Sequence, residues 1–259
     1  MRIGKNSKII SQVKRLKEKK YRDKEGFFLI EGPHLVEEAL KSSFGFEFAL
    51  FSEKAPKEIV AAIEEKEIPS YFVDNSTMKE ISDTENNQGV LGVIPKLAAS
   101  LKDIKRESKQ PIVVCDGIQD PGNLGTIIRT ASAAGCSAVI TSPDSADVYN
   151  SKTVRSTGGA LFHIPVISGE NMEDAVNSLA SSGFKVFCAE PSGGKDLYSA
   201  DLSKKFVIVV GNEGGGVRSG VRRLCDGAVT IPISKSTESL NAAVAVAIIL
   251  FEAVRQRTK

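Results

Sequence analysis

The chain has 259 residues, of which 41% are hydrophobic and 25% charged, a composition typical of a globular protein with one large or two ordinary domains. No apolar run approaches the ~20 residues that a membrane-spanning helix needs, and no signal core follows the basic N-terminus, so we expect a cytoplasmic protein. The four cysteines and two histidines form no paired ligand motif, and we therefore predict no metal site.

The net charge of +2 is unevenly distributed along the chain. Residues 1–24 contain ten Lys and Arg against two Asp and Glu, so this basic block carries +8 and the remainder of the chain −6. Such a block favours a polyanionic partner, with nucleic acid first. The alternative is a solvated basic helix that has no partner.

The first part of the chain alternates between predicted strands and helices. Asn6 or Ser7 can cap a first helix, whose apolar residues recur at helical spacing as far as Leu16. The elements predicted after it are strands at 27–30, 46–51, 71–73 and 90–94 and helices at 35–40 and 56–66. This alternation predicts a small α/β domain over residues 1–95.

A linker and a second α/β domain follow. Residues 96–110 lack a strong apolar face and are assigned to the linker, and residues 111–259 to the second domain. The Val- and Ile-rich runs beyond the linker suggest strands that are buried on both faces of a parallel sheet. We expect strands at 111–115, 138–140, 185–189 and 206–210 and helices at 123–134, 171–182 and 239–256. The last helix is almost wholly apolar, which indicates burial in a core or a subunit interface.

A polar loop follows the first strand of the second domain, in the place where parallel sheets bind ligands. It leads from Asp116 into a helix that carries Asn123 and Arg129. Arg129 has the planar fork that suits a phosphate group. Taken alone, however, Asn123 is equally suited to cap the helix and Arg129 to form a surface salt bridge.

Two further loops follow later strands. The glycines of residues 211–216 let the backbone approach a ligand closely, although a glycine-rich turn without a ligand is the alternative. In residues 231–241, a short predicted strand at 231–233 leads into a polar loop. Ser239 or Asn241 at the end of this loop can simply cap the last helix.

As an ordered set, the three loops resemble the motifs of the SpoU/TrmH family of SPOUT methyltransferases. The matching segments are Asn123-Leu124-Gly125 with Arg129-Thr130-Ala131, Gly211-Asn212-Glu213-Gly214, and Ser239-Leu240-Asn241. Residues 154–162 are also similar to the family, and Glu31-Gly32 resembles the marker of a small RNA-binding domain that many members carry in front. Lys235 and Ala243 depart from the pattern, because many members have Gly and Ser there.

This resemblance implies a fold that composition could not show. The C-terminal parallel-sheet domain is expected to contain a deep trefoil knot, which is a rare exception to the rule that chains are unknotted. A small α/β RNA-binding domain is expected to precede it. The resemblance also implies S-adenosyl-L-methionine (AdoMet) in the knotted loops and a homodimer with the active site near its interface.

The implied activity is methyl transfer to a ribose 2′-OH of structured RNA, with large-subunit rRNA as the first candidate and tRNA as the second. A catalytically silent RNA-binding protein of the same fold is the non-enzymatic alternative. A nucleotide-dependent oxidoreductase is disfavoured, because the chain lacks the G-x-G-x-x-G turn after its first parallel strand.

The resemblance assigns catalysis to Arg129, supported by Asn123, Glu213, Ser239 and Asn241. A guanidinium is a poor base, so we expect Arg129 to hold an RNA phosphate and polarise the hydroxyl. The residues implied in cofactor binding, largely through their backbone, are Gly211, Asn212, Gly214, Ile231, Ile233, Ser239 and Leu240. We assign RNA binding to Lys14, Arg15, Lys19 and Arg155.

Overall fold

The computed structural model describes residues 1–104 and 107–258, and the chain divides into two compact units. Unit 1 comprises Met1–Leu97 and Tyr149–Phe162, and unit 2 comprises Ala98–Val148 and His163–Lys259. Residues 105 and 106 of the predicted linker lie outside the described residues, as does residue 259. None of the described helices combines the length and apolar character that a bilayer crossing requires.

Unit 1 is built on a four-stranded sheet in the order β1-β4-β2-β3. Strand β4 runs antiparallel to both of its neighbours, and β2 and β3 are parallel. The strands are β1 (Phe27–Glu31), β2 (Phe48–Phe51), β3 (Ser70–Phe72) and β4 (Val90–Pro95). The helices before β4 are α1 (Lys8–Leu16), α2 (Lys19–Glu25), α3 (Pro33–Lys41), α4 (Lys57–Glu65) and α5 (Asn75–Ile81).

The strands and helices predicted for the first part of the chain are confirmed, and α2 and α5 are additional. Helix α1 begins as expected, because the Ser7 hydroxyl accepts a hydrogen bond of 3.3 Å from the Ile10 N–H. Its apolar face lies in the core of unit 1, where Val13 and Leu16 pack with residues of the sheet and of α5. The polar faces of α1 thereby remain on the surface with their lysines.

Residues 149–162 follow the first strands of the predicted second domain, yet they pack in unit 1. This segment contains α7 (Ser151–Thr157) and the 3-10 turn η2 (Ala160–Phe162). The rings of Phe28 and Tyr149 lie 4.8 Å apart, and those of Phe44 and Phe162 lie 6.2 Å apart. The predicted boundaries, which treat each domain as one continuous stretch, therefore differ from the compact units of the structure.

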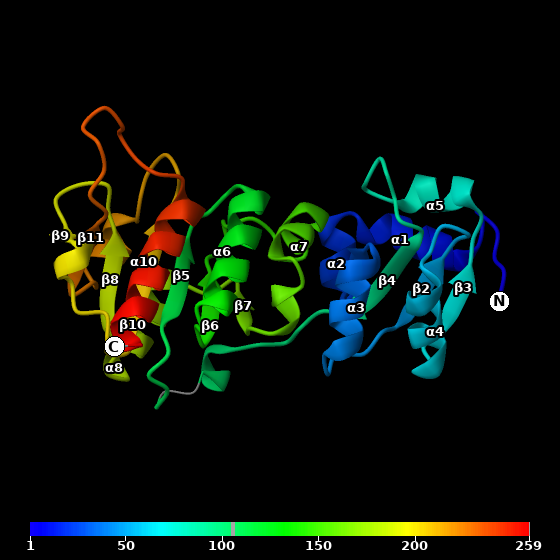
Figure 1. Ribbon diagram of the computed structural model, residues 1–259, viewed down its shortest axis with the longest axis horizontal. Coiled ribbons are helices and arrows are strands. Elements are labelled where there is room, and N and C mark those ends of the chain that lie inside the picture. The colour runs from blue at the N-terminus through cyan, green and yellow to red at the C-terminus, as the bar shows by residue number, and fades with distance from the viewer. Residues whose placement is uncertain (105–106, 259) are drawn as a thin grey trace. The chain divides into compact units, whose positions relative to one another are not determined.

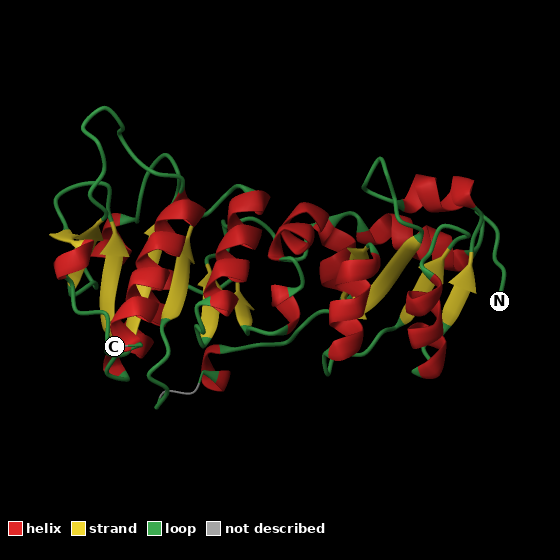
Figure 2. Ribbon diagram, viewed as in Figure 1, coloured by secondary structure: helices red, strands yellow, loops and turns green. Residues whose placement is uncertain are grey.

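Unit 2 is built on a seven-stranded sheet in the order β7-β6-β5-β10-β8-β11-β9, and every pairing between its described strands is parallel. Figure 2 shows these strands in yellow. They are β5 (Ile112–Asp116), β6 (Ala138–Thr141), β7 (Val166–Ser168), β8 (Lys185–Ala189), β9 (Lys195–Asp196), β10 (Phe206–Gly211) and β11 (Gly227–Thr230). This confirms the predicted α/β fold with a parallel sheet; the trefoil knot stays a prediction.

Helices cover both faces of this sheet. Val207 and Val209 of β10 share one core cluster with residues of α8 (Met172–Ser181), whereas Arg257 of α10 (Ala242–Arg257) lies over the ring of Phe206. Successive residues of a strand face opposite sides, so α8 and α10 lie on opposite faces. Helix α10 packs beside α6 (Pro121–Ala133), as Figure 1 shows, and the short α9 (Ser219–Arg222) follows β10.

Two expectations about the last part of unit 2 are wrong. Residues 231–233 form no strand; β11 ends at Thr230, and Pro232 has no N–H to continue a ladder. The last helix begins at Ala242 and not at residue 239. Within unit 2 one side of this helix is buried, whereas Val244 is 47% and Phe251 51% exposed, and the predicted burial in a subunit interface stays a prediction.

Candidate functional site

Three polar segments lie at the edge of the sheet where its parallel strands end. Residues 117–120 follow β5, residues 212–218 follow β10, and residues 231–241 follow β11. Asp116 and Gly211, the last residues of β5 and β10, stand opposite each other in the ladder. Figure 1 shows the third segment as the orange loop between β11 and α10. This is the edge at which open parallel sheets bind ligands.

Asn123 links the first of these segments to the other two. Helix α6 begins at Pro121 and is capped by Asp120, whose carboxylate accepts the Asn123 N–H at 2.8 Å. The Asn123 side chain is therefore not the cap. Its amide instead donates a hydrogen bond of 2.9 Å to Glu213 Oε1 and accepts one of 2.9 Å from the Asn241 amide. Three of the predicted catalytic residues thus form one hydrogen-bonded chain.

Asn241 both caps α10 and takes part in this chain. Its Oδ1 accepts the N–H groups of Ala243 at 2.9 Å and Val244 at 3.3 Å, while its Nδ2 donates to Asn123. The two functions that the sequence offered as alternatives for Asn241 are compatible, because they use different atoms of one amide. The start of α10 is thereby held against the start of α6.

Glu213 remains charged in this setting. Burial raises the pKa of its carboxyl, but hydrogen bonds from the Asn123 side chain and from nearby backbone N–H groups outweigh that effect. The pKa of Glu213 consequently lies below its usual value. An ionised carboxylate accepts hydrogen bonds only, which fixes the direction in which the Asn123 amide points.

The segment after β10 forms a tight turn with Glu213 near its apex. The backbone of Asn212 pairs with that of Gly216 in both directions, at 3.1 and 2.8 Å. A Cβ at Gly211 would come within 2.0 Å of the Gly216 backbone, so glycine is required there by the turn itself. Gly214 is exposed, and the nearest atom to a Cβ there would be Asn212 Oδ1 at 3.5 Å. Gly214 therefore remains open to a ligand.

Arg129 and Ser239, two of the predicted catalytic residues, are exposed and lie apart from this hydrogen-bonded chain. Arg129 is six positions after Asn123 on α6, and Ser239 lies in the segment before α10. Among the described residues, neither side chain has a hydrogen-bond or ion-pair partner. Both side chains are thus accessible from solvent.

The segment between β11 and α10 fits the adenosyl group of AdoMet. Within the described residues, the backbone N–H groups of this segment form only local hydrogen bonds. The Ser236 N–H donates to the Ser234 hydroxyl, and the Thr237 N–H donates to the Ser234 carbonyl. The remaining N–H and C=O groups of residues 231–240 are available to a ligand. Ile231, Ile233 and Leu240 are each partly buried in the same stretch. Open backbone groups beside apolar side chains are what a flat heteroaromatic ring requires.

An ion pair that the sequence did not indicate stands beside these segments. Asp116, whose side chain is fully buried, accepts the Arg218 N–H at 2.9 Å and its Nε–H at 2.7 Å, and it also contacts Arg218 Nη2. The only signal in the sequence was an acidic residue at the end of a predicted buried strand. Its partner is 102 positions away, and sequence spacing alone could not identify it.

The predicted RNA-binding residues all lie in unit 1, and three of them are ion-paired. Lys14 pairs with Glu80 at 2.6 Å, Arg15 with Glu25 at 3.2 Å, and Lys19 with Asp23 at 2.6 Å. Arg155, on α7, is partly buried, and its Nη1 is a buried atom without a hydrogen-bond partner. Lys14, Arg15 and Lys19 are exposed, so phosphate groups can compete for them.

No group of three metal-ligand side chains of the kind that zinc uses gathers anywhere among the described residues. Three of the free cysteines, Cys115, Cys136 and Cys188, are buried, and Cys225 is partly exposed. Burial raises the pKa of the Cys136 thiol to about 12, which keeps it protonated.

Two family models match the chain. The SpoU rRNA Methylase family matches residues 110–251, and the MRM3-like substrate binding domain matches residues 6–92. Together they cover both α/β segments that the sequence predicts.

Individual relatives cover nearly the whole chain. A Bacillus subtilis protein, 23S rRNA (guanosine(2553)-2′-O)-methyltransferase RlmP, is 36% identical over 96% of this chain and 96% of its own length. The AdoMet-bound rRNA methyltransferase of Sinorhizobium meliloti aligns with a TM-score of 0.87 at 32% identity, covering 96% of this chain and 95% of that one. The SpoU methyltransferase AviRb of Streptomyces viridochromogenes, in complex with AdoMet, aligns with a TM-score of 0.88 at 28% identity, covering 97% and 99%.

Proposed function

This chain belongs to the SpoU rRNA methylase family, and we propose that it methylates the ribose 2′-OH of a guanosine in large-subunit rRNA, with AdoMet as methyl donor. The observation that carries the proposal is the hydrogen-bonded chain of Asn241, Asn123 and Glu213 at the edge of the parallel sheet. The name of the Bacillus subtilis relative supports the choice of guanosine and of 23S rRNA.

The chain's residues have two tasks in this reaction. When bound, AdoMet supplies an electrophilic methyl group on a sulfonium. The ribose hydroxyl is a weak nucleophile, which has to be oriented and to lose its proton as the new O–C bond forms. Arg129, exposed on α6, holds the adjacent RNA phosphate and polarises the hydroxyl. Asn123, fixed between Glu213 and Asn241, orients the ribose, and Ser239 contacts the substrate from the opposite segment.

The cofactor is held mainly by backbone groups. Ile231, Ile233 and Leu240, each partly buried, would hold the adenosyl group together with the open N–H and C=O groups of that segment. Gly214 leaves space for the rest of the molecule. Gly211, Asn212 and Ser239 complete the set. Asn212 contributes by shaping the turn, because its backbone pairs with Gly216 and its side chain is bonded to Gly214 and Gly215.

Unit 1 selects the RNA. The match of residues 6–92 to a substrate binding domain supports this division, as does the basic block at its N-terminus. Lys14, Arg15 and Lys19 exchange their carboxylate partners for phosphates, which gives an affinity that falls with salt. Arg155 assists from α7, where its Nη1 lacks a partner. The Bacillus subtilis relative modifies 23S rRNA, and by analogy we place this protein in the cytoplasm.

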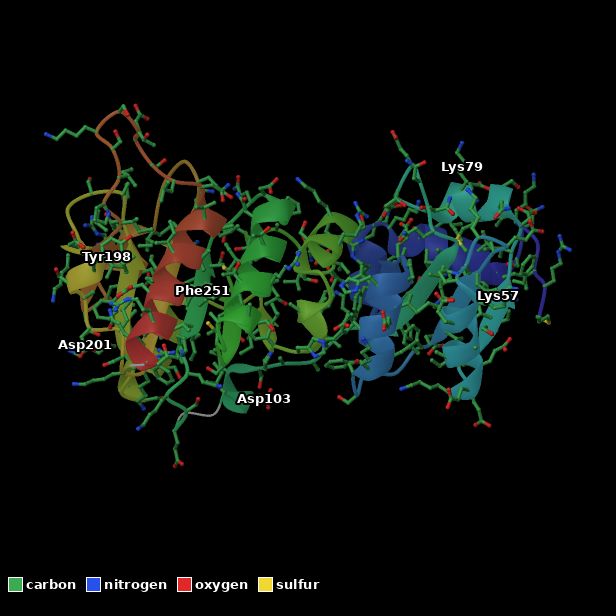
Figure 3. All side chains as sticks on the ribbon, in the orientation of Figure 1. Lys57, Lys79, Asp103, Tyr198, Asp201 and Phe251 are labelled. Carbon is green, nitrogen blue, oxygen red and sulfur yellow. The ribbon has the colours of Figure 1, made fainter. Side chains whose placement is uncertain are left out.

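The protein acts as a homodimer through α10. Val244 and Phe251 are seven positions apart, so they lie on one face of the helix, and about half of each side chain is exposed. Figure 3 labels Phe251 on this helix. In a monomer this apolar surface stays in contact with water, whereas a symmetric dimer buries it against the same face of its partner.

Methyl transfer from radiolabelled AdoMet tests the proposal, with 23S rRNA, assembled large subunits and tRNA as separate substrates. We expect incorporation into 23S rRNA or large subunits, at the 2′-O of a guanosine in a methylation map. The Arg129→Ala variant is expected to lose methyl transfer while AdoMet still binds in calorimetry.

Three results would contradict the proposal. Incorporation into tRNA alone would show that the substrate is tRNA and not large-subunit rRNA. AdoMet binding without transfer to any RNA would indicate a catalytically silent RNA-binding protein. Full activity of the Arg129→Ala variant would remove Arg129 from the mechanism.

A further inference from the structure

The turn at residues 212–216, here called the Glu213 turn, is closed by its own hydrogen bonds. Asn212 Oδ1 accepts the N–H groups of Gly214 at 2.9 Å and Gly215 at 3.1 Å. The backbone pairing of Asn212 with Gly216 closes the turn around this amide. Two flexible glycines, Gly214 and Gly215, are thus held by one side chain, and Gly216 is held by the backbone of the same residue.

Two anchors attach the Glu213 turn to the end of β5. On one side, the Asn212 amide donates a hydrogen bond of 2.9 Å to the Gly117 carbonyl. On the other, Arg218 donates its backbone N–H and its guanidinium to the buried carboxylate of Asp116. Asp116 and Gly117 are adjacent, and the chain continues from them to Asn123. The anchors therefore fix Glu213 relative to its hydrogen-bond partner.

The charges around Arg218 indicate that it is an anchor and does not bind phosphate. Its guanidinium faces Asp116 and also lies 3.6 Å from Asp144. The hydrogen bond with Asp116 raises the pKa of Arg218, so the guanidinium remains charged. Two carboxylates compensate this one cation and would repel a phosphate. Removing Arg218 would also leave a fully buried carboxylate unpaired, which folded proteins avoid.

We propose that Asp116, Arg218 and Asn212 are positioning residues, which hold Glu213 at hydrogen-bonding distance from Asn123. They touch no reacting atom and act through Glu213. This inference rests on the proposed methyl transfer only where activity is the readout.

Two conservative substitutions test the anchors separately. Asn212→Asp keeps the acceptor for Gly214 and Gly215 but cannot donate to Gly117. Arg218→Lys keeps the charge but loses the planar fork on Asp116. We expect each to lower kcat for methyl transfer by about 10- to 100-fold, since small displacements of a catalytic group have effects of this size. The KM for RNA should change little, because unit 1 selects the RNA.

Arg255→Lys is the matched control. Arg255 donates two hydrogen bonds of 2.7 Å to Glu252, and the exposures of the two side chains, 50% and 6%, resemble the 52% and 0% of Arg218 and Asp116. Arg255 lies on α10, the helix of the proposed dimer contact, but lysine keeps its charge, so we expect an unchanged sedimentation mass, a similar loss of thermal stability and no loss of kcat. Equal kcat losses in both Arg→Lys variants would overturn the proposal.

Combination with Glu213→Gln separates positioning from a general structural effect. If Arg218 acts through Glu213, Arg218→Lys adds less than about twofold to the loss already caused by Glu213→Gln. The same fold loss in both backgrounds would show that Arg218 acts independently of Glu213.

Hydrogen exchange gives a readout that needs no activity. The amides of residues 212–217 should exchange about tenfold faster or more in Arg218→Lys and Asn212→Asp, and at the native rate in Arg255→Lys. Unchanged exchange in both anchor variants would overturn the anchoring even if no RNA were methylated. A chain that methylates RNA with unaltered kcat in both variants would overturn the positioning role while leaving the proposed function intact.

Discussion

The side-chain amide of Asn241 donates a hydrogen bond of 2.9 Å to the amide oxygen of Asn123, although the residues are 118 positions apart. The contact ties the first turn of α10 to the first turn of α6, and through Asn123 to Glu213. It makes one edge of the sheet a connected set of polar groups. The predictions that follow test what each part of this set and its surroundings contributes.

Asn241→Asp should separate helix capping from activity. The aspartate still accepts the N–H groups of Ala243 and Val244, and its charge favours a helix N-terminus, so thermal stability should be unchanged or slightly higher. It cannot donate to Asn123, and we expect kcat to fall by about 10- to 100-fold. Asn241→Ala, which loses both functions, should in addition cost about 1 kcal/mol in the free energy of unfolding. Thermal unfolding and methyl-transfer assays measure the two effects. A normal kcat in Asn241→Asp would show that Asn241 only caps α10.

Glu213→Gln should have a pH-dependent effect on stability. The pKa of Glu213 is lower in the folded protein than its ordinary value, so its hydrogen bonds stabilise the fold at neutral pH and cease to do so as the pH falls through the folded pKa. The Tm difference between the native protein and Glu213→Gln should thus be present near neutrality and shrink below the ordinary glutamate pKa of about 4.3. Calorimetric scans over this pH range measure it. A difference that grows in acid would contradict the assigned direction of the pKa shift.

Replacing Lys14, Arg15 and Lys19 together by alanine should weaken RNA binding and its salt dependence. Each phosphate that the protein no longer binds makes the slope of log affinity against log salt shallower by about 0.7 to 0.9, so the slope of the triple variant should be shallower by up to about 2 to 3. Binding titrations at several salt concentrations measure this slope. The control triple, Lys54, Lys57 and Lys79 to alanine, removes exposed lysines of the same unit, two of which are labelled in Figure 3. Equal slopes in the two triples would mean that the basic block has no special role.

Phe251→Glu should convert the proposed dimer into a monomer. A charge placed on the apolar face of α10 would have to be buried unpaired in the interface, which is costly. Sedimentation measures the molecular mass, and circular dichroism checks that the monomer is folded. Tyr198→Glu is the control, because Tyr198 is also a large exposed side chain, 60% accessible, but lies outside α10. If the native protein sediments as a monomer, the proposed dimer interface on α10 does not exist.

The sequence by itself determined the parts of this protein that depend on neighbouring residues. The Val- and Ile-rich runs identified β5 and β10, and the helical spacing from Ile10 to Leu16 identified α1 with its Ser7 cap. The resemblance to the SpoU/TrmH family assigned Asn123, Glu213 and Asn241 to one expected site, and their positions after predicted parallel strands agree with that assignment. Residues 231–233 were misread as a strand because isoleucine favours strands, whereas Pro232 interrupts the ladder.

Only the tertiary structure decided which atoms meet. Asp116 contacts Arg218 because β5 and β10 are neighbours in the sheet. No local sequence pattern predicts this strand order. The Asn212 side chain turns inward because Gly214 and Gly215 present their N–H groups to it. Residues 149–162 join unit 1 because Tyr149 and Phe162 find aromatic partners there. Propensity acts over a few residues, whereas these contacts depend on distant segments being packed together, and for that reason sequence spacing could not assign them.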